Sequence, residues 1–258
     1  AKAGHEILKE QFALNDHLMA VADGVQPGRR KSKFSVLDLW EDSYFQAFRA
    51  PTDNDKSFGN WLAKDWKNQG LDAPQVEVIT PETETQETDG TVSKKSVVEY
   101  RYAKGSIRVS SHYKIYVDGT VDLEQTYLPQ GELPELPRLG SAFVLGEEYE
   151  NLSWYGRGPW ENYPDRKTSL GRWSSKVSSQ YTHYPRPQDS GNHEDVTEVI
   201  LTNKQGKGIR VTAIDQPFSV SAVHYTVDDI YKTTHDCDLK PRKEVILSLD
   251  AAVLGLGN

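Results

Sequence analysis

The sequence predicts an all-β fold, a large antiparallel β-sandwich with one short helix near residues 60–70. Helical periodicity is nearly absent, and short runs that alternate apolar and polar residues recur between turn residues. Between two of these runs lies Asp118-Gly119, a pair suited to a tight hairpin turn because both turn positions require positive φ. At 258 residues the chain is long enough to bury a core without disulfides or metals.

The alternating runs predict the strands of this sandwich. They are Glu6–Leu14, Lys33–Leu39, Gln75–Ile79, Ser93–Tyr102, Ser106–Val117, Thr120–Tyr127, Arg138–Leu145, Val196–Thr202, Gly208–Ala213, Phe218–His224 and Glu244–Asp250. We interpret residues 1–258 as one domain, in which residues 1–14 are the tail of a preceding domain or a linker strand.

One helix and several connections complete the prediction. Trp61, Leu62, Asp65 and Trp66 fall within about one helical turn of each other, with Asn60 as the N-cap and Gly70 as the stop signal. We expect loops at the acidic stretch 81–87, at residues 128–137 and, as a hairpin connection, at residues 204–208.

Composition and charge exclude some classes of function. The net charge of −8 argues against a nucleic-acid partner, since phosphate binding requires a basic face. No apolar run approaches the length that spans a membrane. The single Cys237 has no internal disulfide partner and therefore does not reveal the redox compartment. Because neither an initiator Met nor a signal peptide is visible, we interpret the chain as an excised domain, which leaves cytoplasm and periplasm open.

The stretch from Leu152 to Asp195 combines tryptophans, tyrosines, glycines, acids and bases without repetition. Such a composition suits a surface whose rings stack on sugars or on a protein partner, and equally a folded loop with buried rings. Its acids form candidate pairs, Glu161/Asp165 and Glu194/Asp195, as do Asp53 and Asp55 earlier in the chain. Carboxylates in turn-rich segments beside Arg or Lys usually cap turns and pair with those bases, so we expect a structural role.

Several motifs in this sequence, in the right order, resemble the family 2 β-galactosidases. The chain carries G-x-G-P-x-E-N-Y-P-D-R at residues 156–166 and a Tyr-x-x-Tyr-x-x-P-Q-D-x-G-N element at residues 181–192. The R-A-P-T-D-N-D run at residues 49–55 is similar to an element of the same family, as are Ser219–Tyr225 and the L-G-L-G run at residues 254–257. The chain is therefore identified as the C-terminal, small-chain domain of such an enzyme.

This resemblance implies a galactose mutarotase-like supersandwich and a non-catalytic role. The catalytic glutamates and Mg²⁺ ligands of the family belong to a barrel domain, so the resemblance implies no catalytic residue, metal or cofactor in this chain. We expect it to scaffold and border the active site of a retaining enzyme that hydrolyses terminal β-D-galactosides, with the other domains as its partners. A free-standing carbohydrate-binding or mutarotase-like protein and a separately encoded small subunit remain alternatives.

The resemblance also suggests which loop borders that active site. In related enzymes the loop after R-A-P-x-D-N-D is mobile and reaches the active site. By this likeness the bordering residues are Asp53, Asn54, Asp55, Ser57, Phe58 and Gly59, with Gly59 as a hinge.

A second candidate site is a weak sugar cleft. The proline-interrupted segment Tyr181–Asn192 suits the lip of a cleft better than a central strand. Its planar side chains can bond vicinal hydroxyls. The members of this predicted sugar cleft are His183, Arg186, Gln188, Asp189, Asn192, His193 and His224. A His224 acid paired with Asp189 or Glu194 as base would suit mutarotation, whereas mutual satisfaction in a buried polar network is the structural alternative.

Overall fold

The computed structural model describes residues 8–16, 43–57 and 61–257, with the backbone alone for residues 8–16. The predicted strand Lys33–Leu39 lies outside these residues. Among the described residues no helix is long and apolar enough to cross a membrane.

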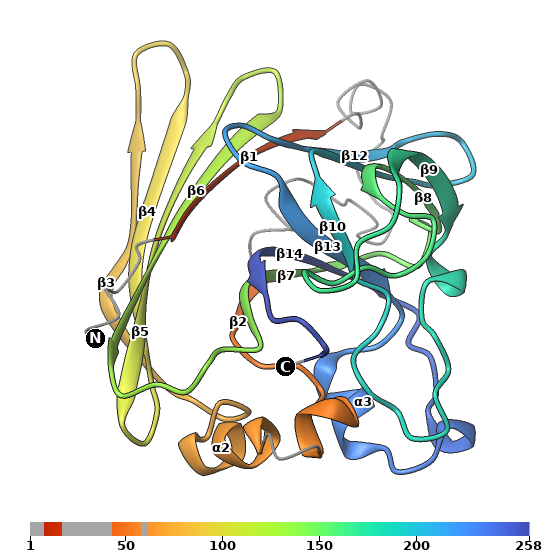
Figure 1. Ribbon diagram of the computed structural model, residues 1–258. Coiled ribbons are helices and arrows are strands. Elements are labelled where there is room, and N and C mark those ends of the chain that lie inside the picture. The colour runs from red at the N-terminus through yellow and green to blue at the C-terminus, as the bar shows by residue number, and fades with distance from the viewer. Residues whose placement is uncertain (1–7, 17–42, 58–60, 258) are drawn as a thin grey trace.

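Two antiparallel sheets form a β-sandwich, which confirms the predicted fold class. The nine-stranded sheet has the order β3-β4-β5-β6-β1-β12-β11-β8-β9, and the five-stranded sheet has the order β10-β13-β14-β7-β2. In Figure 1 the large sheet curves around the small one. The large sheet contains β1 (Leu8–Asp16), β3 (Gln75–Gln86), β4 (Val92–Arg101), β5 (Gly105–Ile115), β6 (Thr120–Gly131), β8 (Asn151–Arg157), β9 (Leu170–Lys176), β11 (Glu198–Thr202) and β12 (Gly208–Ala213). The small sheet contains β2 (Ser43–Gln46), β7 (Arg138–Leu145), β10 (His193–Val196), β13 (Phe218–Val223) and β14 (Val245–Val253).

The hairpin between β5 and β6 follows its sequence signal. Gly119 has a φ of 86°, which its missing Cβ permits. The side chain of Asp118 accepts a hydrogen bond from the backbone N–H of Thr120 (2.9 Å) and closes the turn.

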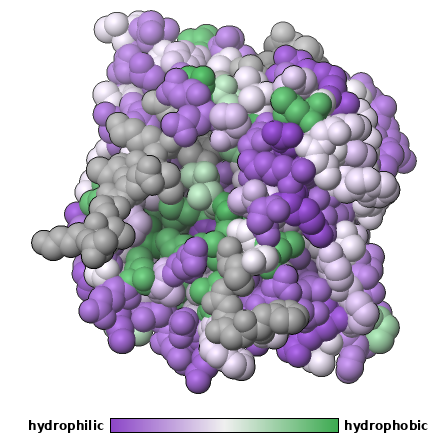
Figure 2. Space-filling model, in the orientation of Figure 1, coloured by the Kyte–Doolittle hydropathy of each residue, from purple (hydrophilic) through white to green (hydrophobic). Residues whose placement is uncertain are grey.

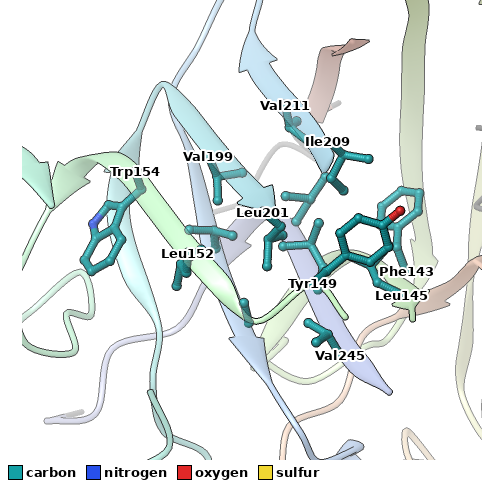
Figure 3. Close-up of a cluster of buried hydrophobic side chains, with 14 of the residues drawn as sticks. Phe143, Leu145, Tyr149, Leu152, Trp154, Val199, Leu201, Ile209, Val211 and Val245 are labelled. Carbon is teal, nitrogen blue, oxygen red and sulfur yellow. The ribbon is translucent and has the colours of Figure 1, made fainter. Parts of the chain in front are cut away.

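The main core lies between the two sheets. Leu152 and Trp154 of β8 and Val199 and Leu201 of β11 belong to one buried cluster with residues of the small sheet such as Val245 (Figure 3). The alternation that places these side chains on one face of each strand is the pattern that predicted β11.

The described residues include two α-helices, which lie outside the sheets. The first, α2 (Leu62–Gln69), confirms the predicted helix, and Gly70 ends it in the left-handed conformation at φ 74°. Its N-cap is Trp61, so the predicted Asn60 cap is wrong by one residue. The second, α3 (Val227–Lys232), was not predicted, although a Thr226/Asp229 capping box begins it.

The structure corrects two of the predicted connections and shows strand pairing within the stretch from Leu152 to Asp195. The acidic stretch 81–87 belongs largely to β3, because Glu84 lies opposite Lys94 on β4 and the whole strand is exposed at a sheet edge. An edge position also tolerates Pro81, which has no N–H to donate. The loop expected from Leu128 begins three residues later, since β6 runs to Gly131. The stretch from Leu152 to Asp195 is a paired hairpin in part, formed by β8 and β9.

Candidate functional site

The candidate site is built around the buried guanidinium of Arg49, which is 0% exposed. Its Nε and Nη2 donate to the two carboxylate oxygens of Asp55 at 3.2 and 2.7 Å, a bidentate ion pair. The same carboxylate accepts from the backbone N–H of Thr52 (2.7 Å) and from its hydroxyl (2.9 Å). The Arg49–Asp55 pair therefore fixes a rigid turn at residues 50–55.

The remaining donors of Arg49 hold the C-terminal segment. Nη1 donates to the carbonyl of Leu254 (2.6 Å) and Nη2 to that of Gly255 (3.0 Å). On its other side this segment donates two backbone N–H groups to Asp165, from Leu256 (2.9 Å) and Gly257 (2.6 Å). A Cβ at Gly255 would lie 2.8 Å from Cγ of Asp165, so the approach of the carboxylate requires glycine there.

Two further motifs join the same structure. The hydroxyl of Tyr163 donates to Asp189 (2.8 Å), and the backbone N–H of Asp189 donates to the carbonyl of Ala50 (3.0 Å). Gln188 accepts from the backbone N–H of Asp53 (2.8 Å). Four motifs distant in sequence, at residues 49–55, 161–166, 187–192 and 254–257, thus form one hydrogen-bonded unit, which we call the motif node.

A buried cluster of charged side chains contacts the motif node through Asp189. Arg138 of β7 donates to Asp250 of β14 (2.9 Å) and lies 3.8 Å from Asp189. Two carboxylates thereby share one guanidinium, and burial raises the pKa of Asp250 to about 6. Sequence reasoning missed this cluster, although Arg138 at the start of β7 and Asp250 within β14, each in a largely apolar strand, were the available signal.

Most of the described residues that were predicted to border the active site lie at the surface of the motif node; Asp55 is buried within it. Asp53 and Asn54 are exposed, and Asn54 donates to the carbonyl of Leu256 (2.5 Å). Ser57 donates to the carbonyl of Asp53 (2.6 Å), whereas Asp55 is buried against Arg49. Phe58 and Gly59 lie outside the described residues.

The structure divides the predicted sugar cleft among several environments. Gln188 and Asp189 are buried in the motif node, and Arg186 lies near Lys56, whose pKa is lowered by partial burial and then by this guanidinium. Asn192 is buried and donates to Glu194 (2.7 Å) and to the carbonyl of Asn162 (2.8 Å).

The three histidines of that set have no partner in common. His183 is exposed and bonds Asp236 (2.7 Å), while His224 bonds Glu150 (3.0 Å). His193 is buried against the ring of Trp154, with ring centroids 4.1 Å apart, and burial lowers its pKa to about 4. Sugar binding by this set remains a prediction.

The candidate carboxylate pairs are engaged in structural contacts, as expected. Glu161 accepts from Arg166, from the hydroxyl of Tyr184 and from the backbone N–H of Gly191. Asp195 pairs with Arg157 (2.8 Å) and Lys167 (2.7 Å). Across the described ranges, no cluster of three or more His, Cys, Asp or Glu side chains could hold a metal ion.

The fold and the motif node define a class of protein: a β-sandwich domain in which hydrogen bonds between the sequence motifs hold the surface turns in a fixed conformation. Residues 29–258 match the family model described as β-galactosidase small chain, and the chain belongs to this family. It is 30% identical over 217 residues to a β-galactosidase of Priestia megaterium and 32% identical over 216 residues to β-galactosidase BgaC of Bifidobacterium adolescentis. A β-galactosidase of Kluyveromyces lactis is 30% identical over 235 residues. These matches cover 81%, 81% and 86% of the chain but only 20%, 20% and 22% of those proteins, so the chain spans about a fifth of their length.

Proposed function

We propose that this chain is the C-terminal domain of a β-galactosidase and that it positions a turn at the border of the active site. The motif node carries the proposal, because it holds the exposed pair Asp53-Asn54 on a buried ion pair and on the C-terminal segment. A turn so restrained keeps its shape when a neighbouring domain docks on it, which limits the entropy lost on docking.

In this proposal the catalytic carboxylates come from elsewhere in the enzyme. A retaining glycosidase needs two carboxyl groups about 5–5.5 Å apart, free to act as nucleophile and as acid/base. Glu161 and Asp165 are instead occupied by Arg166, Tyr184 and backbone N–H groups. The proposed role of the chain is therefore to position the turn at residues 50–55 at the border of the active site. The Mg²⁺ that the family uses would be bound by the catalytic part of the enzyme. We also propose that the sandwich has the galactose mutarotase-like topology that the resemblance implies.

The first test is the activity of the isolated 258-residue chain. We expect no turnover of a chromogenic β-galactoside by the folded, purified chain. Turnover that Glu161→Gln or Asp165→Asn abolishes would overturn the proposal. The gene provides a second check: a reading frame that continues upstream into a barrel domain supports the proposal, whereas a start codon just before Ala1 favours a separate small subunit.

A further inference from the structure

A groove remains between the two sheets, away from the motif node. It has a volume of about 180 Å³ and lies where the edge strand β2 of the small sheet faces β3–β6 of the large sheet. Figure 2 shows hydrophobic side chains at the surface left of centre, over this part of the molecule. Within the described part of the chain, β2 is the last strand of its sheet, and no described strand closes the sandwich at this edge.

A row of polar side chains crosses the floor of the groove. Ser96 of β4 lies opposite Ser111 of β5, and Ser111 lies opposite Gln125 of β6, so all three share one face. The next row along the same face is Val98, Val109 and Tyr127, a row that suits a core. Polar groups in such a place cost free energy unless they find hydrogen-bond partners.

Within the described part of the chain, only some of the polar groups in this row have hydrogen-bond partners. Oε1 of Gln125 accepts from Tyr127 (2.8 Å) and from Ser141 (2.9 Å), and Nε2 donates to Oγ of Ser111 (3.2 Å). Among the described residues the hydroxyl of Ser96 forms no hydrogen bond, and the hydroxyl hydrogen of Ser111 has no acceptor. The row therefore presents an organised but incompletely bonded set of donors and acceptors.

Aromatic rings line the groove beside this polar row. The rings of Phe45 and Tyr100 lie 4.4 Å apart, and Tyr44 is 40% exposed. The charge at the groove is balanced locally, because Glu82 bonds Lys94 at 3.1 Å. Aromatic faces beside neutral hydroxyl and amide groups fit a ligand that has an apolar face and several hydroxyls but no charge.

We propose that this groove is a carbohydrate site. A neutral pyranose ring packs its C–H face on Phe45 and Tyr100 while its hydroxyls bond the Ser96–Ser111–Gln125 row. A charged ligand would find no uncompensated countercharge here, since Glu82 and Lys94 already neutralise each other, and a wholly apolar ligand would leave the polar row unbonded. The proposal is independent of the proposed function, because none of these residues belongs to the motif node.

Saturation-transfer NMR on the 258-residue chain with methyl β-D-galactopyranoside and methyl β-D-glucopyranoside tests the proposal. We expect transfer to at least one sugar, strongest at the protons of its C–H face. Ser111→Val should weaken binding about tenfold, since it removes a hydroxyl that hydrogen-bonds the sugar from the polar row. Ser110→Val is the matched control, because Ser110 precedes it on β5 and points to the opposite face; it should bind as the unchanged chain does.

Further variants keep the result decisive. If the melting temperature shows that Ser111→Val is unfolded, the half-buried Ser96→Val takes its place, with the same expected loss. No transfer to either sugar from the folded chain overturns the proposal and leaves the groove as a hydrated cavity. Transfer that persists in the serine variants but disappears in His183→Ala also overturns it and places the sugar in the predicted sugar cleft instead.

Discussion

Arg49 and Asp55 are the residues on which the motif node depends most. Both side chains are buried, at 0% and 3% exposed, so removing one charge leaves the other without compensation inside the protein. We expect Asp55→Asn to lower the free energy of unfolding by about 3–5 kcal/mol in urea titrations. Glu77→Gln, which breaks the exposed pair with Arg101, should change it by less than about 1 kcal/mol. Equal effects of the two variants would contradict the structural role given to Arg49.

His193 gives the stability of the chain a defined pH dependence. Burial lowers its folded-state pKa to about 4, whereas the unfolded value is 6.5. Because the folded state holds the ring neutral, this contribution is fully present above pH 6.5 and is lost as pH falls from 6.5 to about 4. The expected loss is about 3 kcal/mol.

The difference between the unchanged chain and His193→Gln isolates this effect from other titrating groups. Denaturation curves measured between pH 7 and pH 4 should converge toward low pH, because only the unchanged chain loses the contribution. Asp250 acts in the opposite sense: its raised pKa favours stability below its unfolded value of 3.8, and this contribution is lost as pH rises through about 6. Parallel curves for the unchanged chain and His193→Gln would show that His193 does not titrate as described.

At the scale of elements, strands with one buried face were predictable, whereas of the exposed edge strand β3 only Gln75–Ile79 was predicted. The residues of β12 and β13 alternate or run apolar, and the predicted bounds agree with the structure to within one residue. In β3 every residue is exposed, so its acids gave no apolar pattern; its pairing depends on contacts such as that of Lys94 with Glu82 and Glu84. Leu152 and Trp154 alternate in β8, but the glycines around them suggested a loop.

The helix α3 has only six residues, too few to show a helical periodicity in the sequence. Its N-terminal capping box was therefore the sequence signal that could have predicted it. The hydroxyl of Thr226 accepts from the backbone N–H of Asp229 (3.1 Å), and the Asp229 carboxylate accepts from the backbone N–H of Thr226 (2.9 Å). Thr226→Ala should lower the free energy of unfolding by about 1 kcal/mol, measured by urea denaturation. Thr182→Ala, at an exposed loop position, is the control and should change it by less than about 0.5 kcal/mol. A Thr226→Ala variant as stable as its control would contradict the capping role.

At the scale of the whole molecule, the sequence showed the four motifs of the motif node, but it did not show that they contact one another in the fold. Arg49 bonds carbonyls more than 200 positions away, and no local pattern encodes a contact of that separation. The same limit applies to the predicted sugar cleft: all its members except His224 share one segment of sequence, yet they lie in separate environments. The groove of Ser96, Ser111 and Gln125 became visible only through the register of β4, β5 and β6.

The proposed role in a larger enzyme assigns a function to one exposed side chain. Asp53 projects from the turn with its side chain 70% exposed, and its nearest charged partner, Lys56, lies 3.9 Å away. Because this carboxylate contributes little to the fold, Asp53→Ala should leave the free energy of unfolding within about 0.5 kcal/mol of the unchanged protein.

The most direct measurement is kcat/KM for β-galactoside hydrolysis by the full-length protein carrying Asp53→Ala, beside Asp215→Ala as the control. Asp215 is exposed in the turn between β12 and β13 and takes no part in the motif node. We expect kcat/KM to fall at least about tenfold in Asp53→Ala, a loss of about 1.4 kcal/mol in transition-state stabilisation. The melting temperature should not change, and Asp215→Ala should retain full activity. Full activity in a folded Asp53→Ala enzyme would contradict the claim that this turn borders the active site.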